Sequence, residues 1–467
     1  MAKIVNDLGM LVDDVTGAFR GVIGGDGKEY SIPVFSQDPQ SAPGFTNLNG
    51  QILQYSPARS VNIGAIGNSI TYQNDYGDPK VLNALGYMTW AIILSKGRIN
   101  FDNGLNFGVA GDTTVNVMAR LDAAIAALKA RAAQVCALEI GTNDVNSAVA
   151  YEVTTGNIRT IAFRLLAAGI TPILIPILPR SFGQTTAKSQ QTQRINTFIR
   201  QLARTVPGII LSDPTLHWID QTNANGYPIG ASTATPLAYT YDGLHPSVRG
   251  AFFIGLEIAN SLASRLDSVG MQSWSQTDTY DATLNPTGTV LNNPFLVGTA
   301  GTVGTGATGV VADSYTIQRA AGTTGAVVAS KSTIATDISN SYPSQVCVCT
   351  APGGSANEAF RFFQQKTIVN AIGELLYGEC EIAVSGITPG SFRSLTLSVG
   401  DGTVSAVFNM AGTGYMPDVP WTGVFRTPPI AATVANFASA ILAWSIDGTV
   451  ASAGVTITVS RLDVRKA

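Results

Sequence analysis

Residues 135–178 read VCALEIGTNDVNSAVAYEVTTGNIRTIAFRLLAAGITPILIPIL, and their pattern indicates the fold class most clearly. It begins with residues 135–140, a run of buried-strand length that is apolar except for Glu139. A second apolar run follows at residues 173–178. Between the two runs lies a helical stripe, ended by Gly169 and formed by Ile158, Ile161, Ala162, Leu165 and Leu166. Continuous apolar strands separated by a helix predict a parallel sheet that is covered on both faces.

The alternation of strand and helix extends from this stretch in both directions. Apolar runs of strand length recur at residues 61–66, 105–109 and 208–211. Apolar residues at one-face spacing predict further helices at residues 121–132 and 195–202, and a last helix, apolar on most sides, is expected at about residues 246–266. We therefore expect an α/β domain over residues 58–267.

The second half of the chain has a different pattern. After about residue 267 a Gly/Thr-rich tract gives way to two-residue alternation, as in Val455, Ile457 and Val459. This pattern predicts a linker and an antiparallel β-sandwich over residues 268–467. Residues 1–57 end in a connector rich in Pro, Asn and Gly, which indicates a small N-terminal module. A chain of 467 residues is too long for one core, which agrees with several domains.

Composition excludes several classes of function. Net charge is −3 and no Lys/Arg stripe is present, which argues against a nucleic-acid partner. The only two histidines lie far from the cysteines, so no metal site is expected, and the four cysteines are expected to be free thiols. The first residues lack the layout of a secretory signal, and no apolar run approaches the ~20 residues of a membrane span.

Glycine and polar residues follow three of the predicted strands, in the sequences Gly67-Asn68-Ser69-Ile70, Gly108-Val109-Ala110-Gly111 and Gly141-Thr142-Asn143-Asp144. The carboxyl ends of parallel strands meet at one edge, where α/β sheets place their ligands. A glycine N–H can approach a substrate oxygen there, and an asparagine amide can stabilise an oxyanion. Taken singly, each sequence is better interpreted as an ordinary turn.

A fourth sequence, Asp242-Gly243-Leu244-His245-Pro246, opens the last predicted helix. A turn can bring this Asp and His together, so that the carboxylate orients the imidazole through Nδ1 and leaves Nε2 for a serine. A lone histidine is usually structural, but this one is tied to a carboxylate.

Together the four sequences resemble the blocks of the SGNH (GDSL-like) hydrolase family, over about residues 60–267. The resemblance implies an SGNH-type three-layer α/β sandwich and a serine esterase without metal or cofactor. It implies that Ser69 is the nucleophile, that His245 is the general base and that Asp242 orients His245. It also implies an oxyanion hole made of the Ser69 and Gly111 amides and the Asn143 side chain.

Four other residues bear on this site. The family usually has Asp where this chain has Asn68, which puts the hydrogen bonding of that turn in doubt and leaves the chemistry untouched. Asp144 reads as a hydrogen-bond partner beside Asn143. His217 and Trp218 could line the substrate cleft, although a structural role for His217 is the simpler interpretation.

The flanking regions suggest a setting. The Gly-rich tract and β-sandwich resemble carbohydrate-binding modules of bacteriophage tail proteins, and the N-terminal module, with its Gly25-Asp26-Gly27-Lys28 turn, is similar to their virion-attachment segments. These resemblances imply a virion tailspike or tail-fibre deacetylase that acts on O-acetylated capsule or O-antigen at the host surface. They also imply a homo-oligomer, possibly a trimer, that contacts other tail proteins.

Alternatives remain open from the sequence. The chain could be a bacterial lipase or arylesterase with an accessory domain, or a glycan-binding adhesin on an inactive SGNH scaffold. In the sandwich, Tyr415 and Trp421 could form a sugar platform, or they could be rim or subunit-contact residues.

Overall fold

The computed structural model describes residues 61–75, 81–230, 238–266, 275–335, 341–368, 370–400, 405–409 and 415–466. It also gives the backbone of short strands before residue 54: β1 (Lys3–Val5), β2 (Met10–Asp13), β3 (Phe19–Ile23), β4 (Glu29–Tyr30), β5 (Phe45–Thr46) and β6 (Ile52–Leu53). Strands β1 to β4 pair in that order as one sheet. The turn expected at Gly25-Asp26-Gly27-Lys28 lies outside the described residues.

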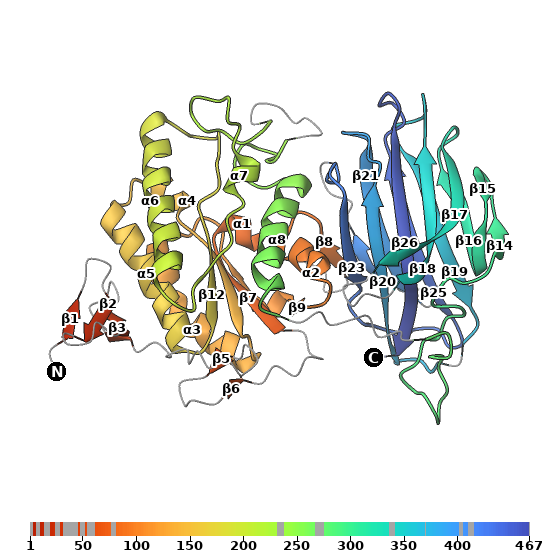
Figure 1. Ribbon diagram of the computed structural model, residues 1–467, viewed down its shortest axis with the longest axis horizontal. Coiled ribbons are helices and arrows are strands. Elements are labelled where there is room, and N and C mark those ends of the chain that lie inside the picture. Colours follow the sequence, from red (N-terminus) through yellow and green to blue (C-terminus); the bar gives the residue numbers. More distant parts are fainter. Residues whose placement is uncertain are drawn as a thin grey trace.

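A parallel sheet forms the centre of the α/β domain (Figure 1). Its strands are β7 (Val61–Gly67), β9 (Ile99–Asn100), β10 (Asn106–Gly108), β11 (Val135–Glu139), β12 (Thr171–Ile175) and β13 (Ile210–Leu211). The order is β10–β7–β11–β12–β13, and β9 pairs with the start of β7. The predicted parallel sheet is thus confirmed. The strand order reverses beside β7, which is where such sheets bind ligands.

Helices cover both faces of this sheet, so the domain has three layers. Figure 1 shows α3, α5 and α6 on one face and α2 and α8 on the other, toward the second domain. The bounds are α1 (Ser69–Tyr72), α2 (Tyr87–Leu94), η1 (Asn103–Leu105), α3 (Thr114–Ala130), α4 (Thr142–Asn146), α5 (Tyr151–Ala167), α6 (Thr186–Thr205), α7 (Thr215–Trp218) and α8 (Val248–Ala263).

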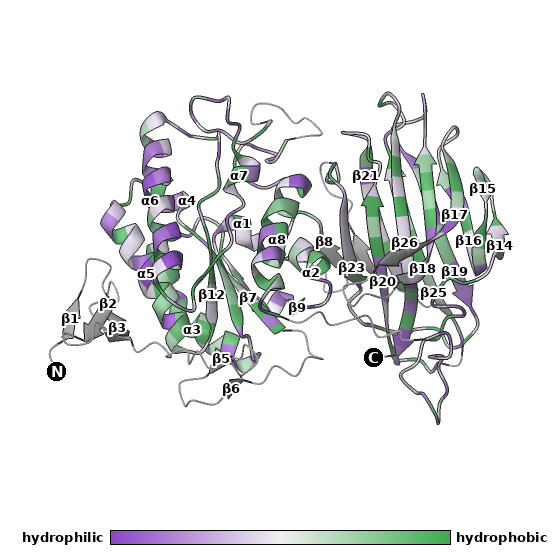
Figure 2. Cartoon of the chain, viewed as in Figure 1, coloured by the Kyte–Doolittle hydropathy of each residue, from purple (hydrophilic) through white to green (hydrophobic). Residues whose placement is uncertain are grey.

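The stripe predicted for α5 explains how that helix packs. Ile158, Ile161 and Leu165 are buried, and Gly169 follows with a φ of +78°, the left-handed conformation that ends helices. Figure 2 shows mostly hydrophilic residues on the outer sides of α5 and α6 and hydrophobic residues in the strands behind them. None of the described helices combines the length and apolar character needed to cross a membrane.

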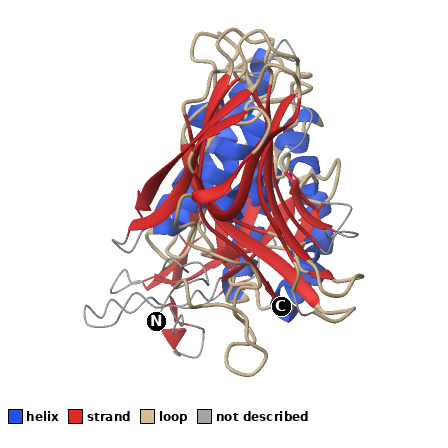
Figure 3. Cartoon of the chain, turned by 90° about the vertical axis from the view of Figure 1, so that its right-hand side faces the viewer, coloured by secondary structure: helices blue, strands red, loops and turns tan. Residues whose placement is uncertain are grey.

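Two seven-stranded sheets form the C-terminal sandwich (Figure 3). One has the order β14–β16–β19–β25–β21–β22–β8, and the other has β15–β17–β18–β26–β20–β23 with β24 paired to β20. Most pairs are antiparallel, as predicted, but β14–β16, β15–β17 and β22–β8 are parallel. The alternation is confirmed in β26, where Val455, Ile457 and Val459 are buried.

The strands of the sandwich are β8 (Val81–Asn83), β14 (Ala300–Val303), β15 (Ala307–Gly309), β16 (Val311–Ala321), β17 (Ala326–Ala335), β18 (Ser341–Thr350), β19 (Glu358–Lys366), β20 (Leu375–Ser385), β21 (Phe392–Gly400), β22 (Ser405–Asn409), β23 (Trp421–Arg426), β24 (Ile430–Ala431), β25 (Ala438–Ile446) and β26 (Gly454–Lys466). Strand β8 comes from the α/β half of the chain, between β7 and α2, and pairs in parallel with β22. The two halves therefore share a sheet.

Aromatic side chains fill the interface between the two domains. The Trp421 ring of β23 lies 5.6 Å from Trp90 of α2 and 6.5 Å from Phe252 of α8, and it is only 5% exposed. A sugar platform at Trp421 is therefore wrong, because its ring packs between the domains. Beside it, Arg249 of α8 forms a 2.8 Å ion pair with Asp418 of the sandwich.

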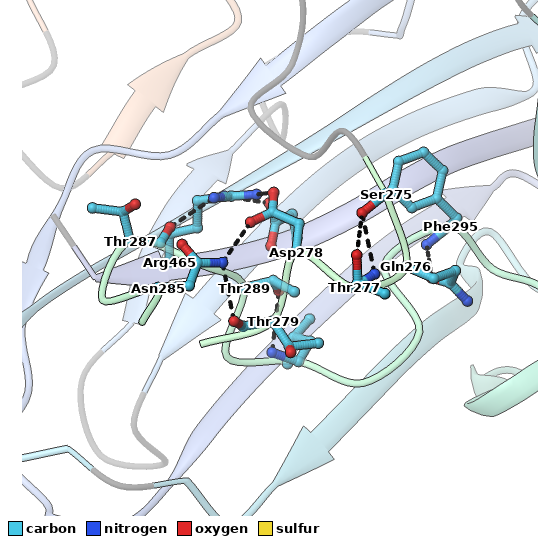
Figure 4. A network of polar contacts seen from close by, with 12 residues as sticks. Ser275, Gln276, Thr277, Asp278, Thr279, Asn285, Thr287, Thr289, Phe295 and Arg465 are labelled. Atoms are coloured by element: carbon cyan, nitrogen blue, oxygen red, sulfur yellow. Dashed lines mark hydrogen bonds and ion pairs between the residues drawn. The ribbon is translucent and has the colours of Figure 1, made fainter. Parts of the chain in front are cut away.

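The segment before β14 is fastened to the last strand of the sandwich. Figure 4 shows Arg465 of β26 reaching Asp278 at 2.5 Å and the Thr287 carbonyl at 2.6 Å. Asn285 donates to Asp278 at 3.0 Å and closes the turn. This irregular segment is thereby held on the sheet by hydrogen bonds where strand pairing is lacking.

All four cysteines are free and buried, as the sequence predicts: Cys136, Cys347, Cys349 and Cys380.

Candidate active site

Ser69, His245 and Asp242 come together at the carboxyl end of β7. Ser69 is the first residue of α1, which follows β7 after a single residue. His245 Nε2 lies 2.9 Å from Ser69 Oγ, and His245 Nδ1 lies 2.6 Å from Asp242 Oδ2. The structure therefore brings the three residues into one hydrogen-bonded chain, with the geometry of a catalytic triad.

A tight turn holds Asp242 and His245 in this arrangement. Asp242 Oδ1 accepts hydrogen bonds from the backbone N–H groups of Leu244 at 2.9 Å and His245 at 2.7 Å. Burial raises the pKa of Asp242, but these bonds and the one from the His245 ring outweigh it and lower the pKa below its usual value. Because the carboxyl is then ionised near neutral pH, His245 Nδ1 carries the proton and Nε2 accepts from the Ser69 hydroxyl.

Asn68 keeps the hydrogen bonding of the nucleophile turn. Its Oδ1 accepts from the Ile70 N–H at 2.8 Å and caps the start of α1. A carboxylate oxygen would fill the same place, so the substitution noted in the sequence leaves this turn intact.

Candidate oxyanion donors follow the two neighbouring strands. Gly111 is the third residue of the turn from Val109 to Asp112, with a φ of +83° that favours glycine. Asn143 follows β11, and its Nδ2 donates to the Asp112 carbonyl at 2.9 Å. Among the described residues, the N–H groups of Ser69 and Gly111 have no acceptor, which leaves both available to a substrate oxygen.

Sequence reasoning missed the residues that tie these loops together. Arg120 of α3 forms a 2.8 Å ion pair with Asp112 and donates to the Gly67 carbonyl at 3.1 Å. It thus links the turn of Gly111 to the end of β7. The only signal in the sequence is an acid directly after Gly111, followed two helical turns later by a base.

Two buried acidic residues, Glu139 and Asp144, lie before and after Asn143 in the sequence. Asp144 accepts from the Thr114 N–H at 2.9 Å and its hydroxyl at 2.5 Å, which matches the hydrogen-bonding role expected of it. Glu139, at the end of β11, is fully buried. Burial raises the pKa of Glu139 to about 8.

The structure places the other predicted substrate residues elsewhere. His217 lies against α8, where it contacts Glu257 at 3.2 Å and stacks on Phe253. Trp218 is fully buried, so its ring has no surface to offer a substrate, and its assignment to the cleft is wrong. Tyr415 in the sandwich donates its hydroxyl to Asp447 at 3.0 Å.

Comparison with known proteins identifies the domain. Residues 65–251 match the model of the GDSL-like lipase/acylhydrolase family. A GDSL-like lipase from Bacteroides thetaiotaomicron is 20% identical, with a TM-score of 0.32, over 43% of this chain and 86% of its own. An acetylxylan esterase from Geobacillus stearothermophilus is 16% identical, with a TM-score of 0.35, over 44% of this chain and 95% of its own. No curated protein matches. Residues 65–251 thus form a domain of the GDSL-like lipase/acylhydrolase (SGNH) family, and the chain is a carboxylic ester hydrolase.

Proposed function

We propose that Ser69 is the nucleophile of this esterase and that His245 is its general base. His245 Nε2 takes the hydroxyl proton as Ser69 Oγ attacks the ester carbonyl, and the alcohol leaves with a proton returned by His245. The acyl-enzyme is then hydrolysed by a water that His245 deprotonates. Asp242 holds the imidazole in the required tautomer and stabilises the imidazolium that forms in each step.

The negative charge that develops on the carbonyl oxygen is assigned to three donors. These are the Ser69 and Gly111 N–H groups and the Asn143 side-chain amide. Asn143 Nδ2 has two hydrogens, of which the Asp112 carbonyl uses one. The second remains for the oxyanion.

The observation that carries this proposal is the 2.9 Å contact between Ser69 Oγ and His245 Nε2. It is also the argument against an inactive adhesin scaffold, since a decayed site has no reason to keep this geometry. Ser69→Ala should abolish hydrolysis of a small acetate ester and leave the thermal unfolding midpoint unchanged. Full activity in this variant would refute the assignment of the nucleophile.

Asn143→Ala should lower kcat by ~100-fold or more, since one oxyanion donor is worth about 3 kcal/mol. Asn146→Ala is the matched control, because Asn146 lies exposed on the same short helix. Equal rates in the two variants would mean that the oxyanion is bound elsewhere.

For the substrate, we propose an O-acetyl group on bacterial surface polysaccharide, removed by a bacteriophage tail protein. Support comes from the chain's organisation, in which a large, weakly charged β-sandwich accompanies the hydrolase domain. Acetate release from purified O-acetylated capsule or lipopolysaccharide tests this role. Hydrolysis confined to long-chain lipid or aryl esters would instead favour a lipase or arylesterase.

Assembly belongs to the same proposal. A tail protein of this kind would be a trimer that attaches to other tail proteins through residues 1–57. Light scattering of the full chain measures its mass directly. The mass of a monomer would contradict the proposed trimer and leave the proposed catalytic mechanism unaffected.

A further inference from the structure

Large apolar side chains are exposed on four segments near the triad. Tyr72 is 51% exposed, Val109 42%, Phe182 65% and Tyr241 42%. Isolated exposed apolar residues are normal on protein surfaces, but a cluster around a reactive centre marks a place where a ligand binds.

Tyr241 is the member of this cluster closest to the chemistry. It directly precedes Asp242, and its ring stacks on the His245 imidazole with centroids 5.8 Å apart and planes 16° from parallel. Its hydroxyl accepts a 2.8 Å hydrogen bond from Gln73 Nε2, one helical turn after Ser69. Tyr241 therefore spans the gap between the nucleophile helix and the Asp242–His245 turn.

Tyr72 and Phe182 belong to the two segments that flank this bridge along its hydrogen bonds, α1 and the residues bound to Gly243. Tyr72 is three residues after Ser69 on α1, a spacing that places both on one helix face. The Phe182 N–H donates to the Gly243 carbonyl at 3.1 Å, which sets Phe182 against the turn that holds Asp242. We call Tyr72, Phe182 and Tyr241 the aromatic rim.

The chemistry of the aromatic rim distinguishes between possible ligands. A pyranose ring offers apolar C–H faces with hydroxyls at its edge, and tyrosine matches both because it has a flat apolar ring and a polar tip. An alkyl chain gains nothing from tyrosine hydroxyls. It is better held by an enclosed aliphatic tube than by rings that are about half exposed.

From this arrangement we infer that the aromatic rim binds the sugar ring that bears the ester, and so makes the enzyme selective for acylated glycosides. The inference rests on the proposed function, since it assumes that the ester is cleaved at Ser69. Val109, the aliphatic member of the cluster, directly follows β10 and is not part of the rim.

The test compares kcat/KM for methyl 6-O-acetyl-glucopyranoside with kcat/KM for ethyl acetate, which has no ring. The variants are Tyr72→Ala and Phe182→Ala, because Tyr241 contacts His245 and its loss would also disturb the base. Each should lower the ratio of the two kcat/KM values by about tenfold, chiefly through KM for the sugar ester. Tyr72→Phe keeps the ring but loses the hydroxyl, so its ratio should fall between those of the wild type and Tyr72→Ala.

Ile372→Ala is the control, since Ile372 is 72% exposed but lies in the distant sandwich. A wild-type enzyme without preference for the sugar ester, or alanine variants with an unchanged ratio, would overturn the inference and leave the esterase intact. A preference for ethyl octanoate that the alanine variants abolish would reassign the rim to an acyl chain.

Binding without turnover separates this inference from the proposed function. Saturation-transfer NMR on the Ser69→Ala protein should show contact between the methyl 6-O-acetyl-glucopyranoside ring and the protein, and Phe182→Ala should weaken it. Should the wild-type enzyme hydrolyse none of these esters, the proposed function fails, whereas this NMR result still decides on the rim. No ring contact in the Ser69→Ala protein would refute the rim.

Discussion

Glu139 lies at the end of β11, directly beside Gly67, the last residue of the strand that leads to Ser69. Because burial raises the pKa of its side chain to about 8, the folded protein keeps this carboxyl protonated at neutral pH. The unfolded chain loses the same proton near the ordinary pKa of 4.5. Over the window between these values the unfolded state binds fewer protons, so the free energy of unfolding falls as pH rises.

Glu139→Gln should remove this dependence, because glutamine has nearly the same shape and does not ionise. We expect the variant to exceed the wild type in free energy of unfolding by a few kcal/mol at pH 9, and by much less at pH 5. Urea denaturation at the two pH values measures the difference. A gain of equal size at both would show that the proton on Glu139 is not its source.

Individual site residues were predictable where position along a strand carried the signal. Ser69, Asn143 and His245 each follow a strand or open a helix, and a parallel sheet brings such positions together. Trp218 and Trp421 were misread because a large aromatic ring suits a buried core and a sugar platform equally well. Which of the two it serves depends on helices and strands distant in sequence, such as α2 and α8 around Trp421.

At the scale of elements, β10 and α1 cross in close contact behind the nucleophile. A Cβ on Gly108 would lie 2.2 Å from the backbone nitrogen of Tyr72, which no side-chain rotation can relieve. Gly108→Ala should therefore displace α1 and with it Ser69. We expect a large fall in kcat for a small acetate ester and a lower thermal unfolding midpoint.

Gly104→Ala is the matched control, four residues earlier in the chain. There the nearest atoms to the added Cβ belong to the end of the flexible, half-exposed Arg131 side chain, which can shift at the cost of its exposed ion pair with Asp102. Near wild-type activity is expected for it. A Gly108→Ala enzyme as active as this control would show that α1 tolerates the shift.

The packing of each helix determines whether its sequence shows a helical period. Helix α5 was predictable because it meets the sheet on one face and solvent on the other, which produces a stripe. Helix α2 has no such stripe, since Tyr87, Met88, Thr89 and Trp90 are all buried between the sheet and the sandwich. An element that is apolar all round gives no helical period, and it cannot be told from a buried strand by spacing alone.

At the scale of the whole molecule, the two domains are joined by more than a linker. They share the sheet that contains β8, pack Trp421 against Trp90, and form the ion pair of Arg249 and Asp418, whose side chains are only 13% and 12% exposed. Length alone predicted more than one core, but not this connection. Strand β8 is only three residues long, and its partner lies in the other half of the chain.

The shared sheet predicts that the domains unfold together. Scanning calorimetry of the full chain should show one cooperative transition, and esterase activity should be lost in step with it. Trp421→Ala should lower this single midpoint, since removing a buried Trp costs about 3–5 kcal/mol. Two separate transitions in the wild-type protein would contradict the coupling.

Strand β8 also limits how this protein could be recombined with others. Replacing the sandwich with another one at residue 267 would leave β8 of the hydrolase domain without its partner strand. Moving this sandwich onto another hydrolase would likewise leave one edge of β22 unpaired. An unpaired strand edge invites association with other chains. A functional hybrid therefore has to carry residues 81–83 and the matching strand from the same parent, so the junction that looks simplest along the chain is not portable in three dimensions.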